Sequence, residues 1–200
     1  MDHGLSILLV DENTDRAALI ERGLHEAGYN RVSIIRETKG VLKKIEDISP
    51  DVIVIDLGNS SRDLLEHMFL VSRTVRKPIA MFVDQSDEQS MYRAIEAGVS
   101  AYVVDGLKKE RIKPILDLAI IRFKAFENIR NERDAAKSAL DDQKLIDRAK
   151  RMLMNARGLS EDEAYESLRK AAMAQNKRMA QIAEAVMTAQ SLMEQCDDRT

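Results

Sequence analysis

Three acidic side chains follow apolar stretches of the sequence and could hold a metal ion together. Asp11 and Glu12 follow the stretch 6–10, and Asp56 ends the stretch 52–56. Carboxylates that meet at one site repel one another unless a hard divalent cation such as Mg²⁺ lies among them. An aspartate held against such a cation can attack a phosphoryl group. The sequence therefore predicts an acidic pocket in which Asp11, Glu12 and Asp56 bind Mg²⁺ and Asp56 is the candidate phosphoacceptor; the alternative is that Asp56 only begins a loop.

Basic side chains are concentrated in the C-terminal part of the chain and could bind phosphates. Residues 145–190 hold 8 Lys and Arg against 6 Asp and Glu, whereas the whole chain has a net charge of −3. Such a local bias is typical of a small nucleic-acid-binding surface, although a solvated helix face gives the same pattern. The candidate RNA-binding residues are Arg148, Lys150, Arg151, Arg157, Arg169, Lys170, Lys177 and Arg178.

Short apolar stretches alternate with segments of helical periodicity over the first 110 residues. The strands are predicted at 6–10, 31–35, 52–56, 79–83 and 101–104, and the helices at 15–27, 38–48, 61–74 and 87–97. This order predicts a doubly wound α/β fold with a five-stranded parallel sheet. Ligand sites of such folds lie at the carboxyl ends of the strands, which adds Val83 and Asp105 to the three carboxylates as candidate site residues.

A long helix is predicted from residue 113 to about residue 155, where Pro114 near its start is the only proline and glycine is absent. Apolar residues recur at Phe126, Ile129, Ala136 and Leu140 with approximate heptad spacing. The pattern favours pairing with a second copy of the chain as a coiled coil, although Arg133 interrupts the seam. The alternative is a solvated connecting helix.

Two further helices are predicted after residue 158. Ser160 and Glu163 have the spacing of a capping box, which marks a helix start. Asn176 is the expected N-cap of the last helix, in which apolar residues follow i, i+3, i+4, i+7 spacing. With the end of the long helix, these elements predict a small three-helix bundle.

The composition excludes several classes of protein. Cys196 is the only cysteine, so no disulfide can form within the chain, and a reducing compartment is expected. No apolar stretch approaches the roughly 20 residues that a membrane span needs, and no signal peptide opens the chain. No grouping of His, Cys or Ser typical of an enzyme is evident. We therefore expect a cytoplasmic protein that is not an enzyme and does not enter a membrane.

Four motifs resemble those of the response-regulator receiver domain in order and spacing, and they predict a receiver-like (CheY-like) domain at 1–124. They are "LLVDEN", "DVIVIDLG", "FVDQSD" and "AIEAGVSAYVVDGL". The resemblance implies Mg²⁺ at Asp11 and Glu12, phosphorylation of Asp56, a Thr or Ser ending the fourth strand and a Lys ending the fifth. This sequence has Val83 and Asp105 at the last two positions. Asp105 would bring a negative charge to a phosphoryl group that already carries about two, so we expect the usual phosphate-driven switch to be lost.

The sequence 147–187 resembles the ANTAR domain of the AmiR and NasT type of regulators, most clearly in "GLSEDEAY". This resemblance predicts a helical coiled-coil linker at 125–144 and a three-helix RNA-binding domain at 145–200. It implies a homodimer that binds paired stem-loops in a nascent leader mRNA and so prevents transcription termination. Arg151 stands where the family often has Gly.

Resemblance to the NasT branch implies control of nitrate and nitrite assimilation genes. Two modes of regulation remain open: capture by an inhibitory protein that senses nitrate or nitrite, which the changes at Val83 and Asp105 favour, and phosphorylation of Asp56 by a sensor histidine kinase. The alternative function is that of a phosphorylation-activated two-component response regulator that acts on another RNA or on DNA.

Overall fold

The computed structural model describes residues 4–58, 61–104 and 109–197, with side chains at 4–58, 61–104 and 110–189. Its sheet has five parallel strands in the order β2-β1-β3-β4-β5. Their bounds are β1 (Ser6–Val10), β2 (Arg31–Ile35), β3 (Val52–Gly58), β4 (Ile79–Val83) and β5 (Ala101–Val104). The predicted doubly wound α/β fold is confirmed, and β3 lies at the centre of the sheet.

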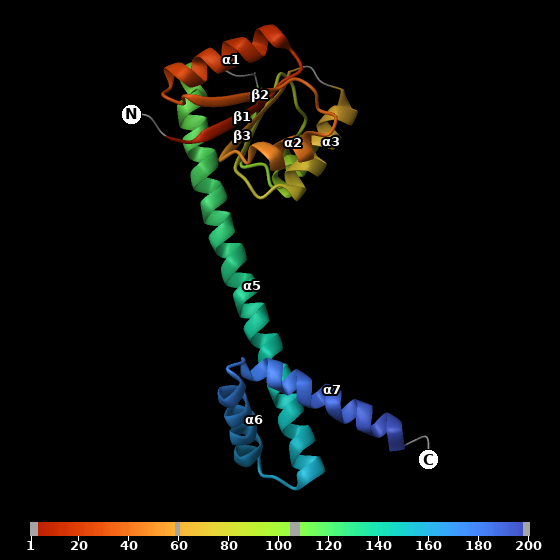
Figure 1. The fold of residues 1–200 in the computed structure, drawn as a ribbon. Helices are drawn as coiled ribbons and strands as arrows, with labels where there is room; N and C mark the ends of the chain where they lie inside the picture. Colours follow the sequence, from red (N-terminus) through yellow and green to blue (C-terminus); the bar gives the residue numbers. More distant parts are fainter. Residues whose placement is uncertain (1–3, 59–60, 105–108, 198–200) are drawn as a thin grey trace. The chain divides into compact units, whose positions relative to one another are not determined.

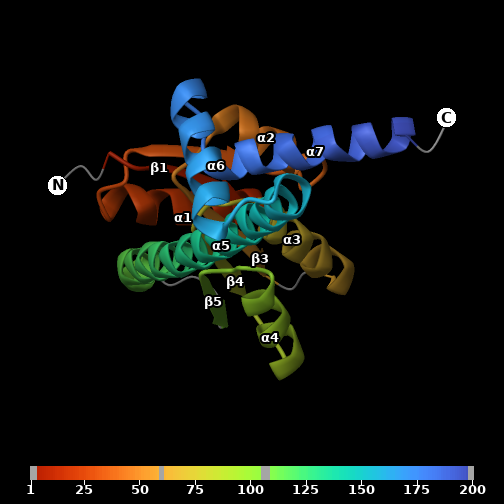
Figure 2. The same ribbon diagram turned by 90° about the horizontal axis from the view of Figure 1, so that it is seen from below.

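Helices cover both faces of this sheet (Figure 1). The helices α1 (Thr14–Glu26) and the first turns of α5 (Ile112–Arg157) pack on one face, through Leu24 and Leu116 among others. The other face is covered by α2 (Val41–Ile48), α3 (Arg62–Thr74) and α4 (Glu88–Glu96); Figure 2 shows α4 beside the strands β4 and β5. Because both faces are covered, every residue of β3 and β4 is buried.

The helix ends follow from local chemistry. The side chains of Asn13, Ser61 and Asp87 accept backbone N–H groups in the first turns of α1, α3 and α4. Gly28 and Gly98 follow the ends of α1 and α4 with φ angles of 94° and 86°, a left-handed conformation that glycine adopts without steric cost. The Asn13 cap, three residues after the carboxyl end of β1, starts α1.

The chain divides into two compact units, Met1–Asn128 and Ile129–Thr200. The helix α5 has 46 residues and runs from the first unit into the second. It follows a short 3-10 turn, η1 (Lys109–Arg111), and Pro114 lies in its first turn, where a missing backbone N–H costs no helical hydrogen bond.

The second unit has a core of its own, formed by the end of α5, α6 (Glu161–Gln175) and α7 (Met179–Asp197). We call the unit the C-terminal module; Figure 1 shows α6 lying along the end of α5. Its buried residues are few and include three alanines on α5 and α6, which let the helices approach closely. The residues that form the buried core cluster are Ile146, Ala149, Leu153, Ala164, Leu168, Ala172, Ile182 and Ala183.

The capping box is confirmed, and one predicted cap is wrong. The Ser160 hydroxyl accepts the Glu163 backbone N–H, and the Glu163 carboxylate accepts the Ser160 backbone N–H. Asn176 ends α6 in the left-handed conformation (φ 50°) instead of starting α7, which begins at Met179. Asparagine serves both purposes, since its side chain caps helix starts and tolerates the left-handed conformation at helix ends.

None of the helices in the described ranges is long and apolar enough to cross a membrane.

Candidate functional site

The acidic pocket lies where two neighbouring strands end. Asp11 directly follows β1 and Asp56 lies near the end of β3, which pairs with β1. Both aspartates are almost completely buried, with 1% and 3% of their surface exposed. A cleft of about 490 Å³ opens beside them, which is room for a hydrated ion or a small anion. The structure thus brings together two of the three predicted ligands at the predicted edge of the sheet.

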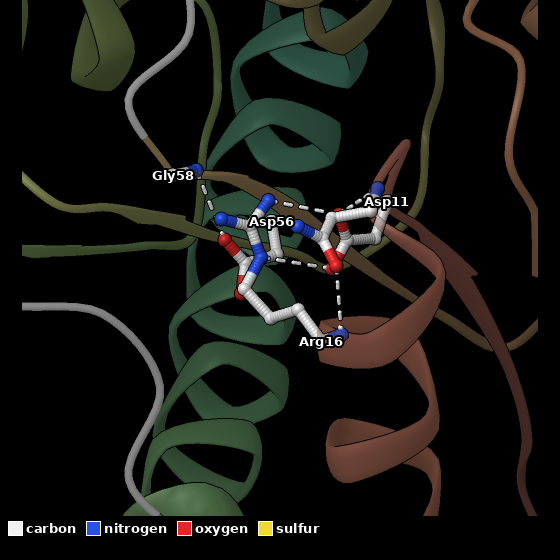
Figure 3. A network of polar contacts seen from close by, with 5 residues as sticks. Asp11, Arg16, Asp56 and Gly58 are labelled. Atoms are coloured by element: carbon white, nitrogen blue, oxygen red, sulfur yellow. Dashed lines mark hydrogen bonds and ion pairs between the residues drawn. The ribbon is translucent and has the colours of Figure 1, made fainter.

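An arginine that the sequence did not single out lies between these two aspartates. Arg16 reaches from the first turn of α1 and donates to both oxygens of Asp11, from Nε at 3.0 Å and from Nη2 at 2.8 Å. Its Nε also lies 3.4 Å from Oδ2 of Asp56 (Figure 3). A guanidinium that bridges two buried carboxylates supplies the positive charge that their burial requires.

A signal for Arg16 was present in the sequence. A cation in the first turn of a helix faces the positive end of the helix dipole, which is an unfavourable position for an exposed side chain. Arg16 is the third residue of α1, and in that place it needs an anionic partner nearby. Asp11 lies five residues before Arg16, at the carboxyl end of β1, and the two residues form the bidentate pair described above.

Asp56 has two unlike oxygens. Its Oδ1 accepts the backbone N–H of Gly58 at 3.1 Å, whereas its Oδ2 is buried and accepts no hydrogen bond from the described residues. The pKa of Asp56 is raised from 3.8 to about 6, mainly because the carboxylate is buried; the charge of Arg16 lowers the pKa and the charge of Asp11 raises it, and both effects are included in this value. The aspartate at the centre of the pocket therefore has an oxygen that accepts no hydrogen bond, although it lies within ion-pair distance of Arg16, and its carboxylate is unusually basic.

Asp56→Asn should stabilise the protein in a pH-dependent manner. The raised pKa means that the folded state disfavours the ionised carboxylate. The free-energy cost of burying this charge is fully present above pH 6 and declines as the pH falls towards 3.8. At about 1.4 kcal/mol per pKa unit, the variant should gain roughly 3 kcal/mol over the natural chain at pH 8 and about half of that at pH 5. Urea unfolding at the two pH values measures the difference. Asp47→Asn, at an exposed position of α2, is the control, and an equal gain at both pH values would contradict the assignment.

The other predicted pocket residues lie in different surroundings. Glu12 lines the cleft, and its carboxylate accepts the hydroxyl of Thr38 at 2.9 Å. Val83 ends β4 and is buried in the apolar core; it is not among the residues that line the cleft. Asp105 lies outside the described residues. Two of the predicted residues therefore meet Arg16, one lies at the rim of the cleft and one packs in the core.

Gly58 allows the arginine to reach its place. A Cβ atom at this position would lie 1.9 Å from Nη1 of Arg16, which is far inside contact distance. The φ angle of Gly58 is 50°, which also favours glycine. The backbone of β3 and the guanidinium thus share a space that a side chain at residue 58 would fill.

The eight basic residues of the C-terminal module fall into two groups. Within the described part of the chain, the side chains of Arg148, Arg157, Lys170 and Lys177 are exposed and have no hydrogen-bond or ion-pair partner. The other four are engaged. Arg169 pairs with Glu166 at 3.0 Å, Arg178 pairs with Asp142 at 3.3 Å, and Arg151 donates to the carbonyl of Asp147. The first group is free to bind phosphates without breaking a contact.

Lys150 is the most strongly engaged of these cations. Its Nζ lies 2.9 Å from Asp147 on the same helix and 2.8 Å from Glu161 at the start of α6, and 14% of its side chain is exposed. The hydrogen bonds that the Lys150 ammonium donates to Glu161 and Asp147 raise the pKa of Lys150. Lys150 therefore connects α5 to α6, a structural role that its sequence did not indicate.

Lys150→Met should lower the thermal stability of the module, because Lys150 is engaged in holding α5 to α6 and is not free to bind RNA. The change leaves Asp147 and Glu161 without their common cation, so we expect the thermal midpoint of the module to fall by a few degrees (about 3 °C). Lys170→Met is the matched control, because Lys170 is exposed and unpaired among the described residues; it should leave the midpoint unchanged. Circular dichroism at 222 nm measures both. A larger loss for Lys170→Met would contradict the division of the cations into two groups.

A parallel sheet with an aspartate near the end of its central strand, and a second beside it, defines a receiver-type signalling domain. The fold is shared with the signal receiver domain of a modulated diguanylate cyclase from Desulfovibrio desulfuricans G20, at a TM-score of 0.51 and 18% identity over 60% of this chain and 97% of that one. The family model of the response regulator receiver domain matches residues 7–117, and that of the ANTAR domain matches residues 134–187. The chain belongs to the response regulator receiver family, and its receiver is followed by an ANTAR domain.

Two relatives are regulatory proteins. The transcriptional regulatory protein PdtaR of Mycobacterium tuberculosis is 27% identical over 181 residues, which are 90% of this chain and 88% of that protein. The nitrate regulatory protein of Klebsiella oxytoca is 39% identical over 77 residues, which are 38% of this chain and 19% of that protein. The first similarity extends over both units of this chain, whereas the second involves a minor part of the larger protein.

Proposed function

We propose that the protein is an RNA-binding transcription antitermination regulator. It binds paired stem-loops in a nascent leader mRNA through the C-terminal module, and the receiver is its regulatory domain. The observation that carries the proposal is the ANTAR match over residues 134–187, which includes all of α6 and the start of α7. The ANTAR family resemblance implies this activity.

The exposed cations of the module support binding to RNA. Arg148, Arg157, Lys170 and Lys177 come from the end of α5, the end of α6 and the turn that follows it. Phosphate contacts of this kind supply most of the affinity for RNA, while unstacked bases in hairpin loops supply sequence specificity. Four contacts are few, which agrees with a protein that binds two copies of a small hairpin.

The proposed homodimer supplies the second binding module. Phe126, Ile129 and Leu140 are large apolar residues of α5 with 61%, 62% and 55% of their surface exposed. They follow the heptad spacing of the predicted coiled coil, and an isolated chain would leave them in contact with water. Pairing of two α5 helices would bury them and bring two modules to one transcript.

Control of nitrate or nitrite assimilation is the proposed biological role. The support is the similarity to the nitrate regulatory protein of Klebsiella oxytoca over 77 residues, together with the resemblance to the NasT branch.

The test of the function is a comparison of two nucleic acids. The full chain should bind a leader RNA with two hairpins with an affinity that falls steeply with salt, and it should bind double-stranded DNA of the same sequence at least tenfold more weakly. Fluorescence anisotropy at 50, 100 and 200 mM KCl gives both affinities and the salt slope. Equal affinity for the DNA would favour the alternative function, a regulator that acts on DNA.

For regulation, we propose capture by an inhibitory protein that senses nitrate or nitrite, in preference to phosphorylation by a sensor histidine kinase. Val83 offers no hydroxyl to a phosphoryl group and packs in the core, and Arg16 already pairs with Asp11 beside Asp56. Asp56→Asn should therefore leave antitermination of a leader–reporter fusion in cells within about twofold of the natural chain. A loss above tenfold in a variant that still folds and binds RNA would instead identify phosphorylation as the signal.

A further inference from the structure

The residues of the acidic pocket do not fit a bound Mg²⁺ in their observed arrangement. Both oxygens of Asp11 accept hydrogen bonds from Arg16, and the carboxylate of Glu12 accepts the Thr38 hydroxyl. In the described ranges, no group of three or more His, Cys, Asp or Glu side chains is placed to hold a metal ion. A hard divalent cation takes several oxygen ligands at once, whereas among the buried side-chain oxygens of the described residues Oδ2 of Asp56 alone accepts no hydrogen bond.

The geometry points to a different cation in this pocket: we propose that Arg16 is its resident cation, and that the pocket binds Mg²⁺ only when the guanidinium is removed. Arg16 contacts both buried carboxylates, as a bridging metal ion would. A divalent cation that entered would have to break the bidentate pair with Asp11 and then lie beside a like charge. Tethering to α1 keeps the guanidinium at a very high local concentration, whereas Mg²⁺ has to come from solution.

Two observations indicate that the place of Arg16 is built into the fold. Gly58 leaves space for Nη1 that any Cβ would fill, so the backbone of β3 accommodates the guanidinium. The Asn13 cap fixes the first turn of α1, because its side chain accepts the Arg16 backbone N–H at 3.0 Å. The side chain of Arg16 is held at its end by Asp11, whose hydrogen bond raises the arginine pKa. The charge at this position is therefore permanent at every physiological pH.

The inference differs from the proposed function because it concerns metal binding at the receiver and needs no RNA. It gives the acidic pocket a cation of its own, which offsets one of the two negative charges, so that Mg²⁺ is not needed to hold Asp11 and Asp56 together. Removal of Arg16 should leave two buried carboxylates that repel each other, with Mg²⁺ as the natural replacement.

The experiment is Mg²⁺ binding by the full chain and its Arg16→Gln variant, measured by isothermal titration calorimetry and by thermal unfolding with 0 and 10 mM MgCl₂. The natural chain should show no saturable binding and a midpoint shift below about 1 °C. Arg16→Gln should be less stable without Mg²⁺, should regain stability with Mg²⁺, and should bind it at least tenfold more tightly than the natural chain. Arg22→Gln, at an exposed position of the same helix, is the matched control and should behave like the natural chain.

A second variant locates the ion. In Arg16→Gln combined with Asp11→Asn, the gain in Mg²⁺ binding should disappear. The proposal is overturned if the folded Arg16→Gln variant gains no Mg²⁺ affinity. It is also overturned if the natural chain binds Mg²⁺ as tightly as Arg16→Gln does and loses that binding in Asp11→Asn. If Arg16→Gln does not fold without Mg²⁺, recovery of the folded state on addition of the ion supports the proposal, and failure to recover contradicts it.

Discussion

Reversal of two exposed charges in the C-terminal module, Arg148→Glu with Lys170→Glu, should lower the affinity for two-hairpin RNA by at least a hundredfold at 100 mM KCl. Both side chains are exposed, and neither has a partner among the described residues, so the substitutions break no contact there. When a phosphate contact is lost, the counterion condensed on that phosphate is no longer released on binding, which lowers the affinity. Each new carboxylate also repels the RNA. The slope of log affinity against log salt should become shallower by about 1–2 units for the pair.

The control for this prediction has the same change in net charge at a different place. Lys39→Glu with Lys43→Glu alters two exposed lysines at and before the start of α2 in the receiver. It should change RNA affinity by less than about threefold, because both lysines belong to the receiver and not to the module that we propose to bind RNA. An equal loss in both double variants would show that net charge, and not the module, controls binding. Fluorescence anisotropy titrations of the natural chain and the two double variants measure the effect.

Leu168→Ala should unfold the C-terminal module at temperatures at which the receiver remains folded. Leu168 is 1% exposed and lies in a core of eight buried residues. Truncation of a buried leucine costs about 2–5 kcal/mol, which is a large part of what so small a core can supply. The receiver has its own two core layers on the two faces of the sheet, so its stability should be unchanged.

Urea unfolding monitored by circular dichroism separates the two outcomes. Leu168→Ala should move the unfolding transition of the module to a lower urea concentration than in the natural chain. The transition of the receiver should stay in place, so that the two transitions lie further apart. Met173→Ala is the matched control on the same helix, because Met173 is 72% exposed, and it should leave both transitions in place. A single transition that shifts as a whole in Leu168→Ala would mean that the two units unfold as one.

The strands and most helices of the receiver could be predicted because local signals are strong there. Fully buried parallel strands have continuous apolar stretches, and the predicted bounds 6–10, 31–35, 79–83 and 101–104 agree with β1, β2, β4 and β5. The remaining strand, β3, extends two residues beyond Asp56, to Gly58. The strand order was not predicted from the sequence; the structure places β1 beside β3, and this neighbourhood brings Asp11 and Asp56 together.

The contents of the site were less predictable, because they depend on side-chain partners that lie apart in the sequence. The sequence indicates that Asp11 and Asp56 meet, and it says little about which cation reaches them, since Arg16 and any metal ion satisfy the same charges. Lys150 illustrates the same limit, because its partner Glu161 is on another helix. The turn at Asn176 shows the same limit in the backbone. Asparagine suits both the start and the end of a helix, so the packing around Asn176 decides that it ends α6.

The close approach of Arg16 to Gly58 has a consequence for how this chain can change during evolution. A Cβ at position 58 would lie 1.9 Å from Nη1 of Arg16, so a substitution that occurs there first has to displace the guanidinium that pairs with Asp11, and we expect it to be disfavoured. Once Arg16 has been replaced by a shorter side chain, the collision is gone, and alanine at position 58 costs only the strain of a left-handed backbone, about 1 kcal/mol. The two positions are therefore epistatic, and substitution has a preferred order. Homologous sequences with arginine at position 16 should therefore have glycine at position 58. They should lose this glycine only in lineages that have already lost the arginine.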